Sequence, residues 1–154
     1  MDSPNNIAIR TLHQTPVSLA PEQCSHLTRL FLCKVPAGFP SPATDYMEEG
    51  LDLNEFLIER KAATFLFEVK GDSMRNAGIL NGDKVVVDRS LQPKHKKIVI
   101  AVVDGECTIK TLYRTRDCIE LRAENPAYPN IKIAGDSQLE VWGVVIGVVR
   151  KYPA

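Results

Sequence analysis

Residues 98–112 read IVIAVVDGECTIKTL, two β-rich runs separated by Asp104-Gly105. Asp-Gly between such runs is among the strongest hairpin signals, because a type I′ turn needs positive φ at both central residues. The stretch therefore predicts an antiparallel hairpin with strands Ile98–Val103 and Glu106–Leu112. Because side chains alternate along a strand, Lys110 is expected on the same face as Thr108 and Leu112.

Short β-rich runs also occur on both sides of this hairpin. The further predicted strands are Thr64–Val69, Lys84–Val87, Ile119–Arg122, Ile131–Ala134 and Glu140–Val149. With the hairpin they make about seven strands, and regularly spaced short strands favour a barrel or a folded-over sheet. The chain is therefore expected to be mainly β.

One short helix is predicted before the strands. Asp52 precedes the helical pattern and Glu55 follows three residues later, which resembles a capping box. The helix is expected to end near Arg60. The apolar residues that share one of its faces are Leu53, Phe56 and Leu57.

The N-terminal part of the chain is rich in proline. Six of the ten prolines lie within the first 42 residues. Proline removes a backbone donor and restricts the residue before it to extended conformations. Residues 1–43 are therefore predicted to be an extended arm without a core of its own, in which residues 22–32 form at most one short helical turn.

The composition bounds the class of protein. The 154 residues include 19 basic and 19 acidic side chains and are 44% hydrophobic, which is typical of one globular domain plus an arm. Zero net charge gives no general attraction to nucleic acid or anionic membranes. Neither a run of about 18 apolar residues nor a secretory signal is visible, so a cytoplasmic protein without a membrane partner is expected.

Cysteine and histidine usage argues against a metal site. The four cysteines contain no C-x-x-C pair, and the three histidines are scattered. Free thiols in a reducing compartment fit this pattern. No metal and no other cofactor is expected.

Two features could carry chemistry. Gly71-Asp72-Ser73-Met74 follows a predicted strand, where a serine nucleophile and backbone N–H donors for an oxyanion can be exposed, although a structural loop serine gives the same pattern. Lys110 lies in mid-strand, where lysine is unusual. An edge-strand lysine that prevents aggregation is the alternative reading.

The two features gain meaning together. A serine hydroxyl needs a base to become a nucleophile, and a neutral lysine can supply it. An ordinary lysine is almost fully protonated at pH 7, so Lys110 would have to be desolvated in order to lower its pKa. Its strand context permits this.

With the segments around them, Ser73 and Lys110 resemble the LexA/UmuD-type Ser–Lys autopeptidases, the peptidase S24 family. The resemblance extends from about Val35 to Val149, and the 37-residue interval between Ser73 and Lys110 matches the family's spacing of nucleophile and base. The other segments that carry it are Gly38-Phe39-Pro40-Ser41-Pro42-Ala43, Asp52-Leu53-Asn54 with Leu57-Ile58, Asn81-Gly82-Asp83 with Val87-Asp88, Ile98-Val99-Ile100-Ala101, Asp104-Gly105-Glu106, and Trp142-Gly143-Val144-Val145.

The resemblance implies a fold like the C-terminal domain of LexA, with Ser73 as nucleophile and Lys110 as general base. It implies that the scissile bond is Ala37-Gly38 and that the backbone N–H groups of Ser73 and Met74 are candidates for the oxyanion hole. Residues 1–37 would then be an arm removed by self-cleavage, and residues 38–154 the peptidase and dimerisation domain.

The same resemblance implies the biological setting. Members of the family act in the SOS response, where a RecA filament on single-stranded DNA promotes cleavage. The product would be the active, UmuD′-like subunit of an error-prone translesion polymerase. The partners would be a second copy of the chain, as a homodimer, and a UmuC-like Y-family DNA polymerase.

Other classes remain open to different degrees. A LexA-like repressor needs a helix-turn-helix domain before the cleavage site, and the 37 proline-broken residues here carry a net charge of only +1. Direct sequence-specific DNA binding is therefore not expected. Signal peptidases share the Ser–Lys chemistry but need a membrane anchor. A catalytically idle dimerisation module with the same fold stays possible.

One departure from the family concerns Lys94-His95-Lys96-Lys97, which replaces a Ser-His-Gly-Asp segment. These residues are predicted to form a solvated turn. Contact with DNA phosphates or an acidic partner is the alternative.

Overall fold

The computed structural model describes residues 17–18, 27–31, 35, 37–39, 48–116, 118–133 and 137–153. The chain divides into two units, one made of Met1–Leu19 with Arg60–Ala154 and the other of Ala20–Glu59. The described residues are mainly β, as the sequence predicts, with a single short α-helix among them.

The larger unit contains one antiparallel sheet. Its strands are β1 (Val17–Ser18), β4 (Thr64–Glu68), β5 (Lys84–Asp88), β6 (Ile98–Val103), β7 (Glu106–Arg114), β8 (Ile119–Arg122), β9 (Ile131–Ile133) and β10 (Leu139–Val149). They are ordered β1-β4-β5-β10-β6-β7-β8-β9. All seven predicted strands are present; β7 continues two residues further than predicted and β4 ends one residue earlier, at Glu68, while Ala134, the predicted end of β9, lies outside the described residues. β1 was not predicted.

The β6–β7 hairpin has the predicted turn. Val103 pairs with Glu106, which leaves a two-residue loop. Asp104 has φ 49° and Gly105 has φ 88°, so both central residues adopt the positive φ that a type I′ turn requires. This local geometry fixes the register that brings Lys110 opposite Val99.

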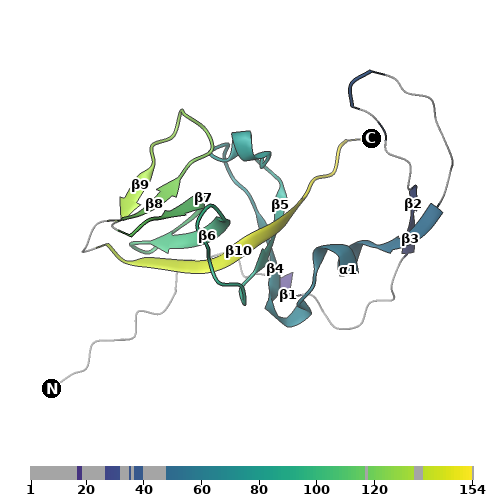
Figure 1. Ribbon diagram of the computed structural model, residues 1–154, viewed down its shortest axis with the longest axis horizontal. Coiled ribbons are helices and arrows are strands. Elements are labelled where there is room, and N and C mark those ends of the chain that lie inside the picture. The colour runs from purple at the N-terminus through teal and green to yellow at the C-terminus, as the bar shows by residue number, and fades with distance from the viewer. Residues whose placement is uncertain are drawn as a thin grey trace. The chain divides into compact units, whose positions relative to one another are not determined.

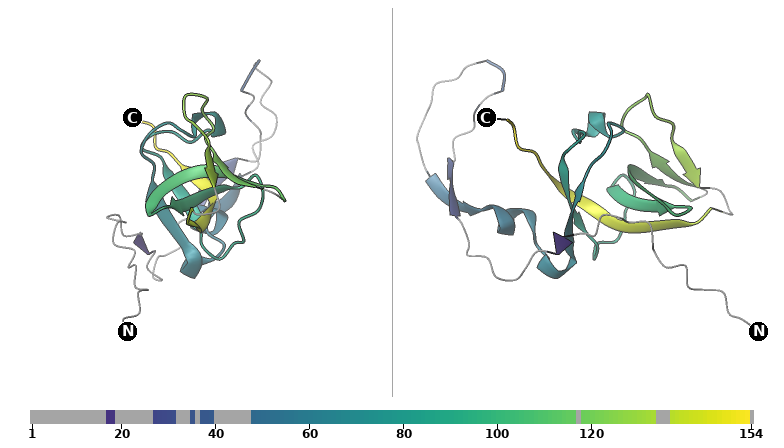
Figure 2. Two further views of the ribbon diagram at one scale, coloured as in Figure 1. Left: turned by 90° about the vertical axis from the view of Figure 1, so that its left-hand side faces the viewer. Right: turned by 180° about the vertical axis from the view of Figure 1, so that it is seen from behind.

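The long strand β10 lies between β5 and β6 and joins the two halves of the sheet. Figure 1 shows it as the yellow strand that crosses the sheet, and Figure 2 shows the same strand from behind. Its register shifts between Val141 and Gly143 against β6, and between Val145 and Gly147 against β5. Such irregularities bend a strand, so β10 can follow the sheet as it folds over.

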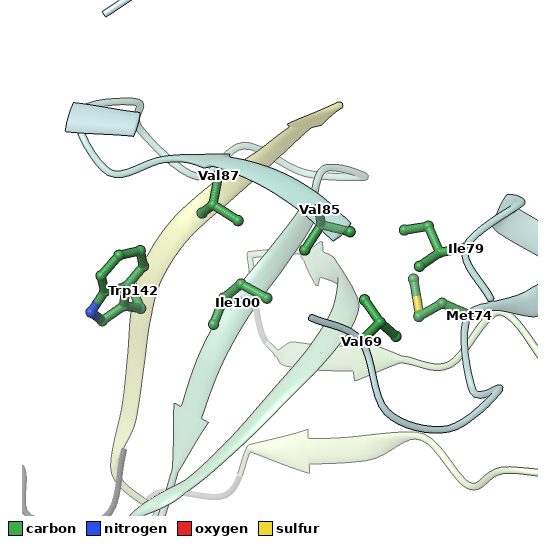
Figure 3. Packing of buried hydrophobic residues seen from close by; sticks show 7 residues of the cluster. All are labelled: Val69, Met74, Ile79, Val85, Val87, Ile100 and Trp142. Carbon is green, nitrogen blue, oxygen red and sulfur yellow. The ribbon is translucent and has the colours of Figure 1, made fainter. Parts of the chain in front are cut away.

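Two apolar clusters form the core of this unit. One consists of Val69, Met74, Ile79, Val85, Val87, Ile100 and Trp142, and Figure 3 shows these side chains gathered between the strands and the loop that carries Met74. Trp142 packs edge-on against Phe65 and Phe67, with ring centroids 5.0 and 4.8 Å away. The other consists of Val99, Ala101, Leu112, Leu121 and Val144.

The smaller unit corrects one expectation about the arm. Instead of a helical turn within residues 22–32, the structure has strand β2 (Leu27–Phe31), paired with β3 (Glu48–Asp52). A single helical turn is costly to nucleate and satisfies few backbone groups, whereas pairing with a distant segment satisfies more of them. Most other residues of the predicted arm lie outside the described ranges.

The predicted helix is present as α1 (Leu53–Leu57), and Asp52 is its N-cap. The Asp52 carboxylate accepts hydrogen bonds from the N–H groups of Asn54 and Glu55 at 2.8 and 3.3 Å. The helix ends three residues before the predicted Arg60, because Ile58 is buried with an extended backbone. In the described part of the chain, no helix is long and apolar enough to cross a membrane.

Candidate active site

The loop after β4 carries Ser73. Gly71 has φ 94° and donates its N–H to the side-chain oxygen of Asn81 at 2.8 Å, so the chain turns directly after the strand. Met74 is 1% exposed and belongs to the core cluster. Its burial anchors the loop and leaves the preceding residue, Ser73, at the surface of a cleft.

Lys110 lies on β7 and reaches the same point. Although it is a lysine, it is only 7% exposed. Its Nζ donates to Ser73 Oγ at 3.0 Å, to Thr108 Oγ1 at 2.9 Å and to the carbonyl oxygen of Ile109 at 3.0 Å. The two residues that the sequence singled out, 37 positions apart, are thus in direct hydrogen-bond contact.

The electrostatic surroundings of Lys110 favour its neutral form. Each partner of Nζ within the described residues is uncharged, so no carboxylate compensates a buried ammonium. Burial lowers the pKa of Lys110 below its ordinary value of 10.5. A neutral amine has two N–H donors and one lone pair, so in that form Nζ donates to Ile109 and Thr108, and the contact with Ser73 reverses so that the hydroxyl donates to the lone pair. The arrangement can therefore take a proton from Ser73.

The backbone N–H groups of Ser73 and Met74 are the candidate oxyanion donors. Neither donates a hydrogen bond to any other described residue. An unsatisfied N–H next to a nucleophile is what an oxyanion hole requires. They remain candidates for that role.

An open cleft of about 530 Å³ contains both Ser73 and Lys110. On one side it is bordered by the end of β4 and the serine loop, and on the other by Cys107–Lys110 of β7. β8 pairs with β7 only from Thr111 to Arg114. The backbone of β7 beside Lys110 therefore has no strand on its cleft side within the described sheet, and an extended peptide could pair with it.

Sequence reasoning missed the residues that hold Asp72. The Tyr128 hydroxyl donates to Asp72 Oδ1, and Asn125 Nδ2 donates to the Asp72 carbonyl at 3.0 Å. Both lie in the loop between β8 and β9, more than 50 residues further along the chain. In the sequence, the Asn- and Pro-rich residues 123–130 indicate only a turn.

The predicted cleavage site lies in the smaller unit. Ala37 and Gly38 are both exposed, and a Cβ added to Gly38 would meet nothing within 4 Å. The neighbouring Phe39 is 92% exposed. The backbone around Ala37 and Gly38 is therefore accessible to solvent, and their small side chains do not shield it.

The remaining predicted features are in the larger unit. The residues Lys94–Lys97 are exposed, and the backbone of Lys96 and Lys97 is hydrogen-bonded to Leu112 of β7 at 2.7 and 2.8 Å. Their turn is thus ordered. Their exposure fits the predicted solvated turn, to which contact with phosphate was the alternative. Within the described residues, no group of three or more His, Cys, Asp or Glu side chains could hold a metal ion.

Comparison with known proteins supplies an independent finding. The model of the Peptidase S24-like family matches residues 29–146. The chain is similar to protein SamA of Salmonella typhimurium, with 45% identity over 86% of this chain and 94% of SamA, and to protein ImpA of Escherichia coli, with 44% identity over 82% and 86%. It is also similar to LexA repressor 1 of Geobacter sulfurreducens, with 40% identity over 75% of this chain and 57% of the repressor.

Proposed function

This chain belongs to the Peptidase S24-like family, and we propose that it is a self-cleaving serine peptidase in which Ser73 is the nucleophile and Lys110 is the general base. The observation that carries the proposal is the 3.0 Å contact between Lys110 Nζ and Ser73 Oγ, made by a buried lysine without a carboxylate partner among the described residues. Burying an unpaired lysine costs free energy, and a lysine that served only a structural surface pair would remain solvated.

The proposed reaction is an acyl transfer followed by hydrolysis. Neutral Lys110 accepts the proton of the Ser73 hydroxyl as Ser73 Oγ attacks a peptide carbonyl. The N–H groups of Ser73 and Met74 are proposed to stabilise the oxyanion of the tetrahedral intermediate. The lysine ammonium then protonates the leaving amine, and water hydrolyses the acyl-enzyme to return Ser73 to its starting state.

The proposed scissile bond is Ala37-Gly38. Small residues let the backbone approach a serine closely, and both residues are exposed. Pro36 favours an extended segment before the bond, which lowers the entropy lost on docking into the cleft. Because enzyme and substrate share one chain, the effective concentration of the bond is high.

The biological role is proposed from family membership. The family resemblance and the similarity to ImpA and SamA support a role in the SOS response, with cleavage promoted by a RecA filament on single-stranded DNA. The product that begins at Gly38 would form a homodimer and act as the accessory subunit of a UmuC-like translesion polymerase. A cytoplasmic location is part of the same proposal.

The decisive experiment measures the intact mass of the purified protein over time. Wild type, Ser73→Ala and Lys110→Ala are incubated at pH 7 and at about pH 10, where a lysine base is increasingly neutral, with and without a RecA filament. We expect the two masses that result from cutting between Ala37 and Gly38 in wild type only.

The chain offers matched controls. Ser137→Ala removes the serine of a second Gly-Asp-Ser tripeptide, at residues 135–137, and Lys132→Ala removes an exposed lysine of β9. Both variants are expected to cut themselves at the wild-type rate. If wild type stays intact under every condition, the self-processing function is refuted, and the chain would be an idle dimerisation module.

A further inference from the structure

The loop between β8 and β9 contacts both the loop that carries Ser73 and the strand that carries Lys110. We propose that Glu124, Asn125 and Tyr128 in this loop are positioning residues that hold the serine loop and β7 at the separation that the pair needs. This inference rests on the proposed function, since it assigns roles around the same site. None of the three residues is proposed to contact the substrate or the reacting atoms.

Asn125 holds the residue before the nucleophile. It is 3% exposed, and its Nδ2 donates to the carbonyl oxygen of Asp72 at 3.0 Å and to Asp72 Oδ2 at 3.4 Å. Its Oδ1 accepts the N–H of Ala127 at 3.1 Å, which fixes which end of the amide faces Asp72. A buried amide with both ends engaged cannot rotate without leaving polar atoms unpaired.

Tyr128 holds the same aspartate through its other carboxylate oxygen. Its hydroxyl donates to Asp72 Oδ1, while its ring borders the cleft that contains Ser73. The hydrogen bond to Asp72 raises the pKa of Tyr128, so the phenol stays protonated and remains a donor over the physiological range. Asp72 is therefore held through its carbonyl and both carboxylate oxygens.

Glu124 completes the connection to the lysine strand. Its backbone oxygen accepts the N–H of Asn76, three residues after Ser73, at 2.8 Å. Its Oε1 accepts the hydroxyl of Thr111 at 2.7 Å. Thr111 is 5% exposed and directly follows Lys110 on β7. The two-residue segment Glu124-Asn125 is thus hydrogen-bonded to the serine loop on both sides of Ser73 and to the β7 residue that follows Lys110.

This connection matters because the direct link between the two residues is a single hydrogen bond of 3.0 Å. A general base must stay within hydrogen-bond reach of the proton it removes, and a displacement of about 1 Å can cost roughly 100-fold in rate. A loosened loop would also admit water beside Lys110 and weaken the desolvation that favours the neutral amine. Both effects would act without any change in the chemical groups themselves.

The test uses the full-length protein with the variants Asn125→Ala, Tyr128→Phe, Glu124→Ala and the conservative Glu124→Gln. Asn130→Ala is the matched control, because the one hydrogen bond that its side chain makes among the described residues is with the N–H of Ala123, in the same loop. Two quantities are measured for each: the rate of self-cleavage from pH 7 to 11, and the pKa of Lys110 by NMR of the labelled lysine Cε. Lys110→Ala in the Ser73→Ala background identifies the resonance.

Asn125→Ala and Glu124→Ala are expected to cut at least about 10-fold more slowly at pH 7, and Tyr128→Phe about 3-fold more slowly. Their pH–rate midpoints and the pKa of Lys110 should both move upward. Glu124→Gln keeps an acceptor for Thr111 and should restore most of the rate, and Asn130→Ala should match wild type. Loss of global stability alone would lower the melting temperature without moving either midpoint.

The outcomes separate this inference from the proposed function. If the pKa of Lys110 is the same in wild type, Asn125→Ala and Glu124→Ala, the positioning role is overturned, whether or not wild type cuts itself. If wild type never cuts itself while the pKa shifts as expected, the proposed function fails and the positioning of Lys110 stands. If wild type cuts itself and all variants cut at its rate, the positioning role is again overturned.

Discussion

Replacing Gly143 by alanine tests the packing at the centre of the sheet. Gly143 lies in β10, at the point where the register with β6 shifts. Its Cα closely approaches Val87 and Asp88 of the other neighbouring strand, β5. An added Cβ would lie 2.7 Å from Val87 Cγ1 and 3.2 Å from the carbonyl oxygen of Asp88. Ordinary contacts begin near 3.4 Å, so Val87 or the β10 backbone would have to move by about 0.7 Å.

The structure offers little room for that movement. Val87 is fully buried in the core cluster with Trp142, and a β-branched side chain has few alternative rotamers. Overpacking of this kind costs about 1–3 kcal/mol. For a chain of this size the corresponding loss in Tm is roughly 3–10 °C.

Thermal unfolding followed by circular dichroism measures this loss. Gly38→Ala, in the Ser73→Ala background, is the control, because nothing lies within 4 Å of its added Cβ, and its Tm should change by less than about 1 °C. Val87→Ala removes the clashing methyl group, so the double variant should be destabilised by less than the two single changes together. An unchanged Tm for Gly143→Ala, or strictly additive effects, would refute the packing argument.

Three further predictions concern charge and reactivity. Burial lowers the pKa of Lys110, so between the lowered value and about 10.5 the lysine is protonated in the unfolded state and neutral in the folded state, and the free energy of unfolding should rise with pH. Urea titrations should therefore show Lys110→Met to be more stable than wild type at pH 7. The difference in free energy of unfolding between the two proteins should become smaller at high pH. The hydrogen bonds from Arg150 lower the pKa of Asp83, so the stabilising effect of its carboxylate is present above pH 3.8 and is lost as the pH falls through the lowered value. Asp83→Asn should therefore lower the Tm by roughly 5 °C at pH 7 and by less in acid. The control Lys84→Ala, which removes an exposed ion pair, should have little effect on the Tm at either pH. Desolvation raises the pKa of Cys107, so iodoacetamide should alkylate it several-fold more slowly at pH 8 in the folded protein than in urea, and equal rates by mass spectrometry would contradict this.

The fold was largely predictable where the signals are local. The Asp104-Gly105 turn and the cap at Asp52 each depend on residues within a few positions, and both are confirmed. The helical turn predicted within residues 22–32 was wrong, because β2 forms by pairing with β3, about 20 residues away. Nothing in the local pattern of Leu27–Phe31 identifies that partner.

The candidate site shows the same division. Ser73 and Lys110 could be named from the sequence because the resemblance to the Ser–Lys family, with its 37-residue interval, links two local signals that are ambiguous when taken alone. Their supporting residues could not, because Asn125 and Tyr128 meet Asp72 only through the folding of the sheet. A turn rich in asparagine and proline has the same sequence signature whether it supports a site or faces solvent.

The sequence by itself determined seven strands of the larger sheet, the hairpin register and the two residue types able to form a serine–lysine pair, since alternation and turn chemistry act over a few residues. Only the tertiary structure decided that Lys110 is buried among uncharged partners and that its Nζ meets Ser73 at 3.0 Å. The physical reason is that desolvation depends on every segment packed around the amine. The described partners of the amine come from the loop after β4 and from β7, and only the folded sheet brings these segments together.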